Sequence, residues 1–239
     1  MYHVMVRGIN SQDIFEDDED RLFFLNVIKD CKEISRFKLY GFCLMSNHVH
    51  LLLETGEEPL GQIMKRIGSR FVYWYNWKYQ RTGHLFQDRY KSETVEDQSY
   101  FLTVLRYILQ NPVKAGLVKQ PGNYRWSSFQ AYMKQEGSFT DTQFAIDITG
   151  SKEVLIQYLQ EANDDKVMDE EDFHQRRTDE EARKIIQSMT GCRSVSDYQR
   201  LDRELKKSYA KKLIGEGLSM GQVSRLTGMS KTAVFSAVH

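Results

Sequence analysis

Apolar residues in the first hundred positions follow two different periods. Short runs rich in aliphatic, aromatic and β-branched residues, typical of strands, are Tyr2 to Gly8, Lys38 to Met45 and His48 to Glu54. Only Ser46 and Asn47 separate the second run from the third, which predicts an antiparallel hairpin. A more polar run, Leu85 to Val95, is expected to form a fourth strand at a sheet edge or along a groove.

Helical spacing of apolar residues fills the stretches between these strands. It runs from Arg21 to Ser35, from Leu60 to Tyr79 and from Ser99 onward. Asn111-Pro112 is expected to end the last helix, because proline disfavours a helical residue before it. The resulting order is typical of the split βαβ, ferredoxin-like arrangement. The sequence therefore predicts an α+β fold, with an antiparallel sheet and helices packed on one face.

The last third of the chain has a different composition. Residues 164 to 179 are highly charged with few apolar side chains, which favours a linker. Two short helices, Met220 to Thr227 and Lys231 to Val238, are predicted on either side of Gly228-Met229-Ser230, the outline of a helix-turn-helix. Helical patterns also cover residues 178 to 190 and 195 to 214. We expect three parts: a domain at 1–135, a helical extension and acidic linker at 136–177, and a small all-α domain at 178–239.

Charge is distributed unevenly although the net charge is zero. Residues 60 to 134 carry 12 basic and 4 acidic residues, and residues 182 to 239 carry 11 and 4. The intervening residues 135 to 181 carry 4 basic and 14 acidic residues. Two basic regions are compatible with two polyanion-binding surfaces, and equally with solvated helix faces beside a solvated linker.

The cysteines and the apolar runs bear on cellular location. Three cysteines, odd in number and widely separated, favour a reduced intracellular compartment. The first ten residues lack the apolar segment of a signal peptide, and no apolar run approaches the roughly 20 residues that span a bilayer. We therefore expect a cytoplasmic protein without a membrane partner.

Two histidines on one predicted strand are candidate metal ligands. His48 and His50 are two residues apart, so both side chains point to the same face of the strand. Neutral imidazoles at this spacing can bind one divalent ion if a carboxylate, amide or water completes the shell. The alternative is a hydrogen-bonded pair of sheet histidines, and the spacing alone does not decide between them.

A tyrosine and an asparagine lie one turn apart near the end of a predicted helix. Tyr107 and Asn111 would share a helix face. A tyrosine phenolate can attack a phosphodiester and hold the cleaved strand covalently. The alternative is a tyrosine in the core.

A nearby segment interleaves basic residues with five aromatic residues, a pattern that suits stacking on unpaired bases: Tyr73, Trp74, Tyr75, Trp77 and Tyr79.

Taken together, these residues resemble a known family. The chain is similar to the single-tyrosine HUH transposases, in particular the REP-associated tyrosine transposase branch, over about residues 2 to 133. Four runs carry the resemblance in order and spacing: LMSNHVHLLLE, RTGHLFQDRYKS, YILQNPVKAGLV and YRWSSF. Ser46 stands where the family usually has a proline, and the C-terminal helices lie outside the shared region.

The resemblance implies a set of roles. His48, His50 and Asn111 would hold Mg²⁺ or Mn²⁺, and Tyr107 would be the nucleophile. The substrate would be single-stranded or hairpin DNA, nicked and transferred through a 5′-phosphotyrosine with release of a 3′-hydroxyl. The resemblance also implies transposition or recombination chemistry on the same split βαβ fold. It leaves open whether the protein is a monomer or a homodimer.

Further residues are expected to contact DNA. In the first domain, backbone contacts are expected from four cations: Arg89, Lys91, Arg106 and Lys114. The C-terminal helix-turn-helix would present Lys231, Thr232 and Ser236 to duplex DNA, with Ser230 capping the second helix. Glu54 is a weak candidate general base.

Two alternatives stay open. One is a non-catalytic regulator that binds DNA through a transposase domain, and the other is a metal-dependent hydrolase of small phosphoesters that does not use Tyr107.

Overall fold

The computed structural model describes residues 1–134, 138–163, 165, 167, 179–192, 194–218 and 220–238. The chain forms two compact units, Met1–Met168 and Asp169–His239, and each is described by itself. Most of the segment predicted as an acidic linker, residues 164 to 179, lies outside the described residues.

A four-stranded antiparallel sheet organises the first unit. Its strands are β1 (Tyr2–Arg7), β2 (Lys38–Leu44), β3 (His48–Glu54) and β4 (Lys91–Thr94). They lie in the order β2-β3-β1-β4, with every neighbouring pair antiparallel. This is the order of a split βαβ sheet, which confirms the predicted α+β class. The first strand is central, so it pairs with residues nearly fifty and ninety positions away.

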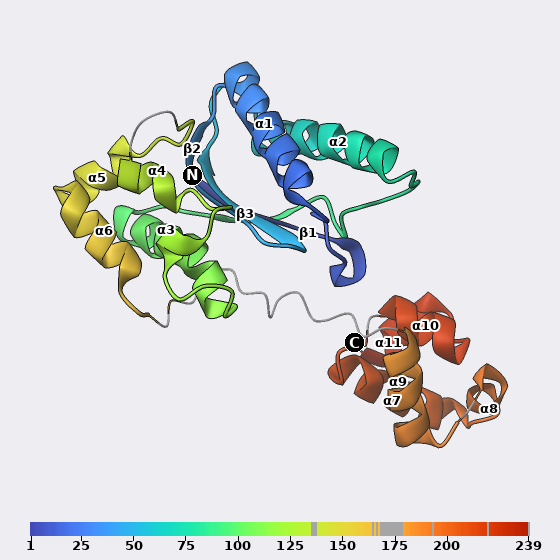
Figure 1. The fold of residues 1–239 in the computed structure, drawn as a ribbon. Helices are drawn as coiled ribbons and strands as arrows, with labels where there is room; N and C mark the ends of the chain where they lie inside the picture. The colour runs from blue at the N-terminus through green and yellow to red at the C-terminus, as the bar shows by residue number, and fades with distance from the viewer. Residues whose placement is uncertain are drawn as a thin grey trace. The chain divides into compact units, whose positions relative to one another are not determined.

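Two helices cover one face of this sheet (Figure 1). They are α1 (Asp18–Ser35) and α2 (Leu60–Lys78). The side chains of Asp17 and Asp20 form a capping box at the start of α1, which satisfies backbone N–H groups that the first turn leaves open. Apolar residues of both helices pack on the alternate strand residues that point their way, among them Val49, Leu51 and Leu53.

The second face is also covered, which corrects the expectation of helices on one face only. Helix α3 (Gln98–Lys114) packs there against β2 and β3, and Leu52 joins its core. The helices that follow are α4 (Phe129–Lys134), α5 (Gln143–Thr149) and α6 (Lys152–Gln160), and buried residues from all three extend that core. Strands β2 and β3 are buried along nearly their whole length on both faces, so helices on one face alone would leave the other face in water.

Helix α3 continues past the predicted stop. Pro112 lies inside it and the helix ends at Lys114, where the Ala115 N–H still donates to the Asn111 carbonyl at 2.9 Å. A proline removes a single backbone donor, and the last turn tolerates the loss because it is held by burial of residues 107 to 112. Asn111 is therefore a helical residue, and the helix determines the direction of its side chain.

The fourth strand is shorter than predicted. Only Lys91–Thr94 forms β4, whereas the prediction began at Leu85. The preceding segment touches β1 through a single bridge between Gly8 and Phe86, and then leaves the sheet. Two 3₁₀ turns, Ile9–Ser11 and Pro121–Asn123, complete the regular structure described in this unit.

The second unit is helical throughout its described part (Figure 1). Its helices are α7 (Asp179–Thr190), α8 (Val195–Gln199), α9 (Arg203–Gly215), α10 (Met220–Thr227) and α11 (Lys231–Val238). The single helix predicted from Val195 to Ile214 is split, because Asp202 caps a new helix through the N–H of Glu204. Ser230 caps α11 through the N–H of Ala233 at 3.2 Å, as predicted.

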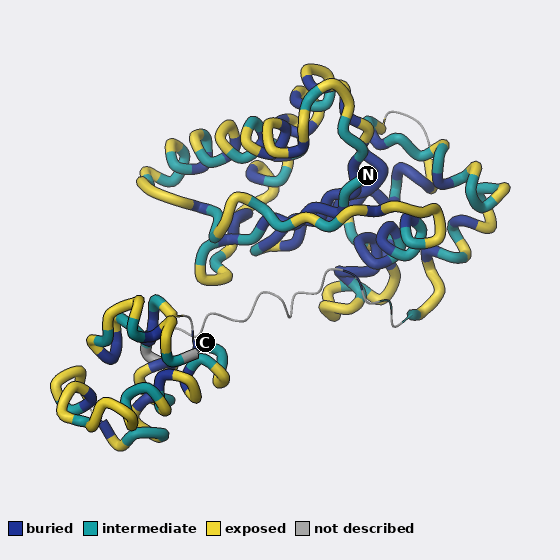
Figure 2. The backbone as a smooth tube through the Cα atoms, turned by 180° about the vertical axis from the view of Figure 1, so that it is seen from behind, coloured by how far each residue is buried: buried dark blue, intermediate teal, exposed yellow. Residues whose placement is uncertain are grey.

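Burial follows the same division into units (Figure 2). The first unit has two apolar cores, one on each face of the sheet, and the second unit has one of its own. Among the described residues, no helix has both the length and the apolar character needed to cross a membrane.

Candidate active site

The two candidate metal ligands lie on the sheet face covered by α3. In an antiparallel ladder, directly opposed residues point to the same face. His50 of β3 lies opposite Met5 of β1, and His48 lies opposite Arg7. Helix α3 packs on this face, so side chains from its last turns lie next to the histidines.

His50 is fully buried and hydrogen bonded on both ring nitrogens. Its Nδ1 lies 3.0 Å from Nε2 of His3. Its Nε2 accepts a hydrogen bond from the Asn111 amide, with 3.3 Å between the nitrogens. Burial, and then the nearby His48 and His3, hold the pKa of His50 well below its ordinary value of 6.5. The ring is therefore neutral at neutral pH, which is the form that binds metals.

Tyr107 lies against the same histidine. Its ring centroid is 5.7 Å from that of His50, edge to face, and 6.0 Å from that of His3. The Lys114 ammonium nitrogen is 4.8 Å from the centre of the tyrosine ring. Tyr107 is 5% exposed, so the nucleophile candidate lies at the margin of the core with a cation beside it.

His48 is the first residue of β3, directly after the hairpin turn. Its Nδ1 is 2.7 Å from Oδ1 of Asn47, and its ring centroid is 5.0 Å from that of His50 with the rings nearly perpendicular. The turn itself is held because the Ser46 carbonyl accepts from the backbone N–H of Ile14 at 2.8 Å. The structure thus brings His48, His50, Tyr107 and Asn111 together within one chain.

Three residues of this cluster were missed by sequence reasoning. His3 donates from Nδ1 to Oε1 of Glu93 at 2.8 Å, and the Tyr100 hydroxyl donates to the other Glu93 oxygen at 2.9 Å. His3 is fully buried. The available signal was the alternation within the first strand, which gives His3 and Met5 one face, but the pairing of that strand with β3 and β4 is long-range.

The donor set fits a divalent ion in chemical type. Two neutral imidazoles and an amide oxygen suit first-row divalent metals, and the amide also suits Mg²⁺. The Asn111 amide can present its oxygen in place of its nitrogen by turning about its last side-chain bond. In the described part of the chain, no group of three His, Cys, Asp or Glu side chains is placed to hold a metal; the further donor beside His50 is the Asn111 amide, 3.3 Å away.

The four cations predicted to contact DNA backbone occupy different surroundings. The Arg106 guanidinium makes two hydrogen bonds to Asp165 at 2.7 and 2.8 Å and lies 4.0 Å from the ring centre of Tyr158. The Nε and Nη2 donors of Arg106 are therefore already used by a carboxylate. Lys114 lies beside Tyr107, and Lys91 begins β4 opposite Met5, on the histidine face.

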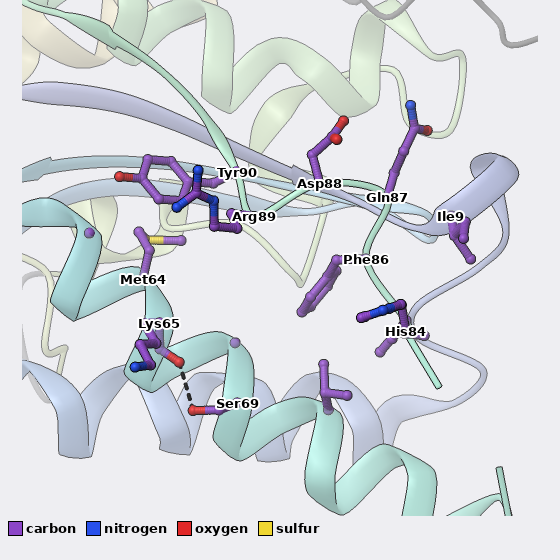
Figure 3. Close-up of a pocket in the computed structure, with 14 residues that line it drawn as sticks. Ile9, Met64, Lys65, Ser69, His84, Phe86, Gln87, Asp88, Arg89 and Tyr90 are labelled. Carbon is purple, nitrogen blue, oxygen red and sulfur yellow. Dashed lines mark hydrogen bonds between the residues drawn. The ribbon is translucent and has the colours of Figure 1, made fainter. Parts of the chain in front are cut away.

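Arg89 belongs instead to a pocket on the α2 side of the sheet (Figure 3). The pocket has a volume of about 520 Å³ and lies between α2 and the segment before β4. Met64 and Lys65 contribute from α2, and Phe86 and Tyr90 from the facing segment. Glu54 is the last residue of β3, and its carboxylate accepts from the Tyr40 hydroxyl on β2.

Of the five aromatic residues in α2 and its end, two are available to a ligand. Tyr73 is 79% exposed and Trp77 is 67% exposed, one helical turn apart. Tyr75 is buried, and Trp74 stacks on Phe23 with centroids 4.1 Å apart. In the second unit, the side chains predicted to reach duplex DNA are all exposed on α11: Lys231, Thr232 and Ser236.

Comparison with known families gives a match over this part of the chain. Residues 1–111 match the family model described as "Transposase IS200 like". This range includes every residue of the cluster described above except Lys114. The N-terminal unit therefore contains a domain similar to IS200-like transposases.

One solved structure is similar to part of this chain. It is that of a REP-associated tyrosine transposase bound to a REP hairpin, with a TM-score of 0.46 and 17% sequence identity. The alignment covers 59% of this chain and 87% of that chain. Comparison with curated proteins gives no significant match.

Proposed function

We propose that the first unit is a metal-dependent endonuclease and strand-transferase for single-stranded, hairpin-containing DNA, acting through a 5′-phosphotyrosine. The observation that carries the proposal is the convergence of Tyr107 and Asn111 of α3 with His48 and His50 of β3. The similarity of residues 1–111 to IS200-like transposases supports it. Two imidazoles and an ammonium lie close to the Tyr107 ring, those of His50, His3 and Lys114, which a tyrosine that only fills the core would not require.

Tyr107 supplies the attacking oxygen in the proposed reaction. The Tyr107 hydroxyl loses its proton and its oxygen forms a bond to phosphorus. The bond from phosphorus to the 3′ oxygen breaks in line, and that oxygen leaves as a 3′-hydroxyl after gaining a proton. Attack by another 3′-hydroxyl on the phosphotyrosine reverses these steps and joins a new strand, so the energy of the phosphodiester is conserved.

Lys114 and a bound metal would assist the attack by Tyr107. An ordinary tyrosine has a pKa of about 10, which leaves little phenolate at neutral pH. The Lys114 ammonium lies 4.8 Å from the ring centre of Tyr107 and would stabilise negative charge that develops on the phenol oxygen during the attack. His48, His50 and Asn111 would hold Mg²⁺ or Mn²⁺, which would withdraw charge from the scissile phosphate when bound.

The remaining contacts with DNA are assigned by exposure. Tyr73 and Trp77 would stack on unpaired bases, since they are the two α2 aromatics that lie in solvent. The second unit would bind duplex DNA through α11, whose Lys231, Thr232 and Ser236 are exposed. Arg106 is not assigned to DNA, because its guanidinium is paired with Asp165.

The proposal is tested by trapping the covalent intermediate. The purified full-length protein is mixed with labelled single-stranded hairpins and manganese, and denaturing gels and mass spectrometry locate any attached nucleotide. We expect attachment to Tyr107, loss of the adduct in Tyr107→Phe with hairpin binding retained, and an unchanged adduct in the control Tyr73→Phe. An undiminished adduct in Tyr107→Phe would remove that residue from the reaction.

The same assay separates the two alternatives. A non-catalytic regulator would bind the hairpin and form no adduct with manganese present. A hydrolase of small phosphoesters would keep its turnover of a chromogenic phosphoester in Tyr107→Phe.

A further inference from the structure

A continuous line of hydrogen bonds crosses the sheet beneath α3. It begins at Tyr100 in the first turn of α3, whose hydroxyl donates to Glu93 on β4 at 2.9 Å. Glu93 accepts from His3 on β1 at 2.8 Å, and His3 Nε2 lies 3.0 Å from His50 Nδ1 on β3. His50 Nε2 then meets Asn111, near the end of the same helix, at 3.3 Å.

With both imidazoles neutral, the carboxylate at one end of this line determines the direction of every bond. A carboxylate only accepts hydrogen bonds, so His3 must carry a proton on Nδ1 to bond Glu93. In a neutral His3 the other nitrogen, Nε2, is then an acceptor, and His50 must donate to it from Nδ1. His50, also neutral, is left with an unprotonated Nε2. Asn111, donating from the far end, requires the same unprotonated nitrogen.

We infer that Glu93 and His3 are positioning residues, which hold His50 in the tautomer whose Nε2 lone pair points at Asn111. A free histidine divides its proton between two nitrogens, and a metal binds only the one without a proton. A histidine ligand whose second nitrogen donates to a fixed acceptor is oriented and made more basic, and loss of such an acceptor typically weakens metal affinity 10- to 100-fold.

Burial supports a positioning role over chance contact. His3 and His50 are both fully buried, and the rings stack at 26° with centroids 5.2 Å apart. Two neighbouring buried imidazoles are a costly arrangement unless each polar atom is paired, and this line of bonds pairs all four ring nitrogens. The line also connects three strands to both ends of α3, so it fixes Asn111 relative to His50.

The inference rests on the proposed function, in that it treats His50 as a metal ligand. Its first test uses no metal. Two-bond proton–nitrogen correlation spectra of histidine-labelled, metal-free protein report which ring nitrogen carries the proton. We expect Nδ1 protonation at both His3 and His50. A wild-type spectrum with the His50 proton on Nε2 would overturn the inference.

The second test measures manganese affinity by calorimetry in matched variants. His3→Phe keeps a ring of similar size without an acceptor and should weaken manganese binding 10- to 100-fold. His3→Gln can place an amide oxygen near the lost Nε2 and should restore much of the affinity. Met5→Leu changes a buried residue on the same strand and face, and should bind manganese as the wild type does.

The outcomes separate the two claims. Wild-type protein that binds no manganese contradicts the proposed function, while the tautomer spectrum still judges the inference. Wild-type protein that binds manganese, together with a His3→Phe variant that binds within twofold of it, contradicts the inference alone. Thermal unfolding of each variant establishes that it is folded.

Discussion

Lowering the pH from 7.5 to 5.5 should destabilise the first unit through His50. The pKa of this ring is well below 6.5 in the folded protein, because the ring is buried beside His48 and His3. In the unfolded chain the ring has its ordinary pKa of about 6.5. Between these values the unfolded state binds a proton that the folded state does not, so stability is full above pH 6.5 and falls as the pH drops.

The magnitude follows from this difference in proton binding. At pH 5.5 the unfolded ring is about ten-elevenths protonated, which stabilises the unfolded state by about 1.4 kcal/mol relative to high pH. At pH 7.5 the same contribution is below about 0.1 kcal/mol. Carboxyl groups with lowered pKa values change the free energy of unfolding at pH values below this range. For example, the Arg66 guanidinium lowers the pKa of Glu58 from 4.5 to about 2.

Urea unfolding followed by tryptophan fluorescence measures this effect in the first unit alone. All three tryptophans, Trp74, Trp77 and Trp126, lie in that unit. The free energy of unfolding of the wild type should fall by about 1.4 kcal/mol between pH 7.5 and 5.5. In His50→Gln it should be lower at both pH values and should lose most of this pH dependence. An equal slope in the variant and the wild type would refute the assignment to His50.

Three more predictions concern packing, capping and charge. In Gly41→Ala, the new β-carbon would lie 2.8 Å from Cδ1 of Leu105 in α3; we expect a loss of about 1–3 kcal/mol in urea unfolding and a lower adduct yield as α3 shifts. Ser230→Ala removes the cap of α11 and should cost about 1 kcal/mol, seen as faster hydrogen exchange of the α11 amides. Lys114→Met should lower the rate of adduct formation about fivefold, since it removes the Coulomb attraction between this ammonium and the charge developing on the phenol oxygen, about 1 kcal/mol in water-like surroundings. Unchanged adduct rates in Lys114→Met, or unchanged amide exchange in Ser230→Ala, would contradict the respective reasoning.

Local patterns in the sequence were sufficient to predict the class of fold. Strand alternation and helical spacing are properties of neighbouring residues, and they located β1 to β3, α1 and α2 closely. They could not show what covers the second face of the sheet, because runs apolar on both faces look the same whether or not a later helix packs there. The early end predicted for α3 at Asn111 came from a local rule about proline that burial of the last turn outweighs.

The candidate site likewise contains residues that local spacing predicts and residues that it does not. His48 with His50, and Tyr107 with Asn111, are pairs at short spacing, so each pair could be recognised alone. His3 and Glu93 are 90 positions apart and meet only through the pairing of β1 with β4. The pairing of Arg106 with Asp165 was equally hidden, since charge counts along the chain cannot say which cation is already neutralised by a carboxylate.

Helix α3 is tied to the sheet near both of its ends, at Tyr100 through Glu93 and at Asn111 through His50. A rod fastened at two points cannot slide along its own axis without breaking one of the attachments. These two attachments therefore hold the backbone of α3 at Tyr107 in place relative to the sheet. In the proposed reaction, exchange of one DNA end for another at Tyr107 would then occur by movement of the nucleic acid or of the phenol ring, with the helix in place.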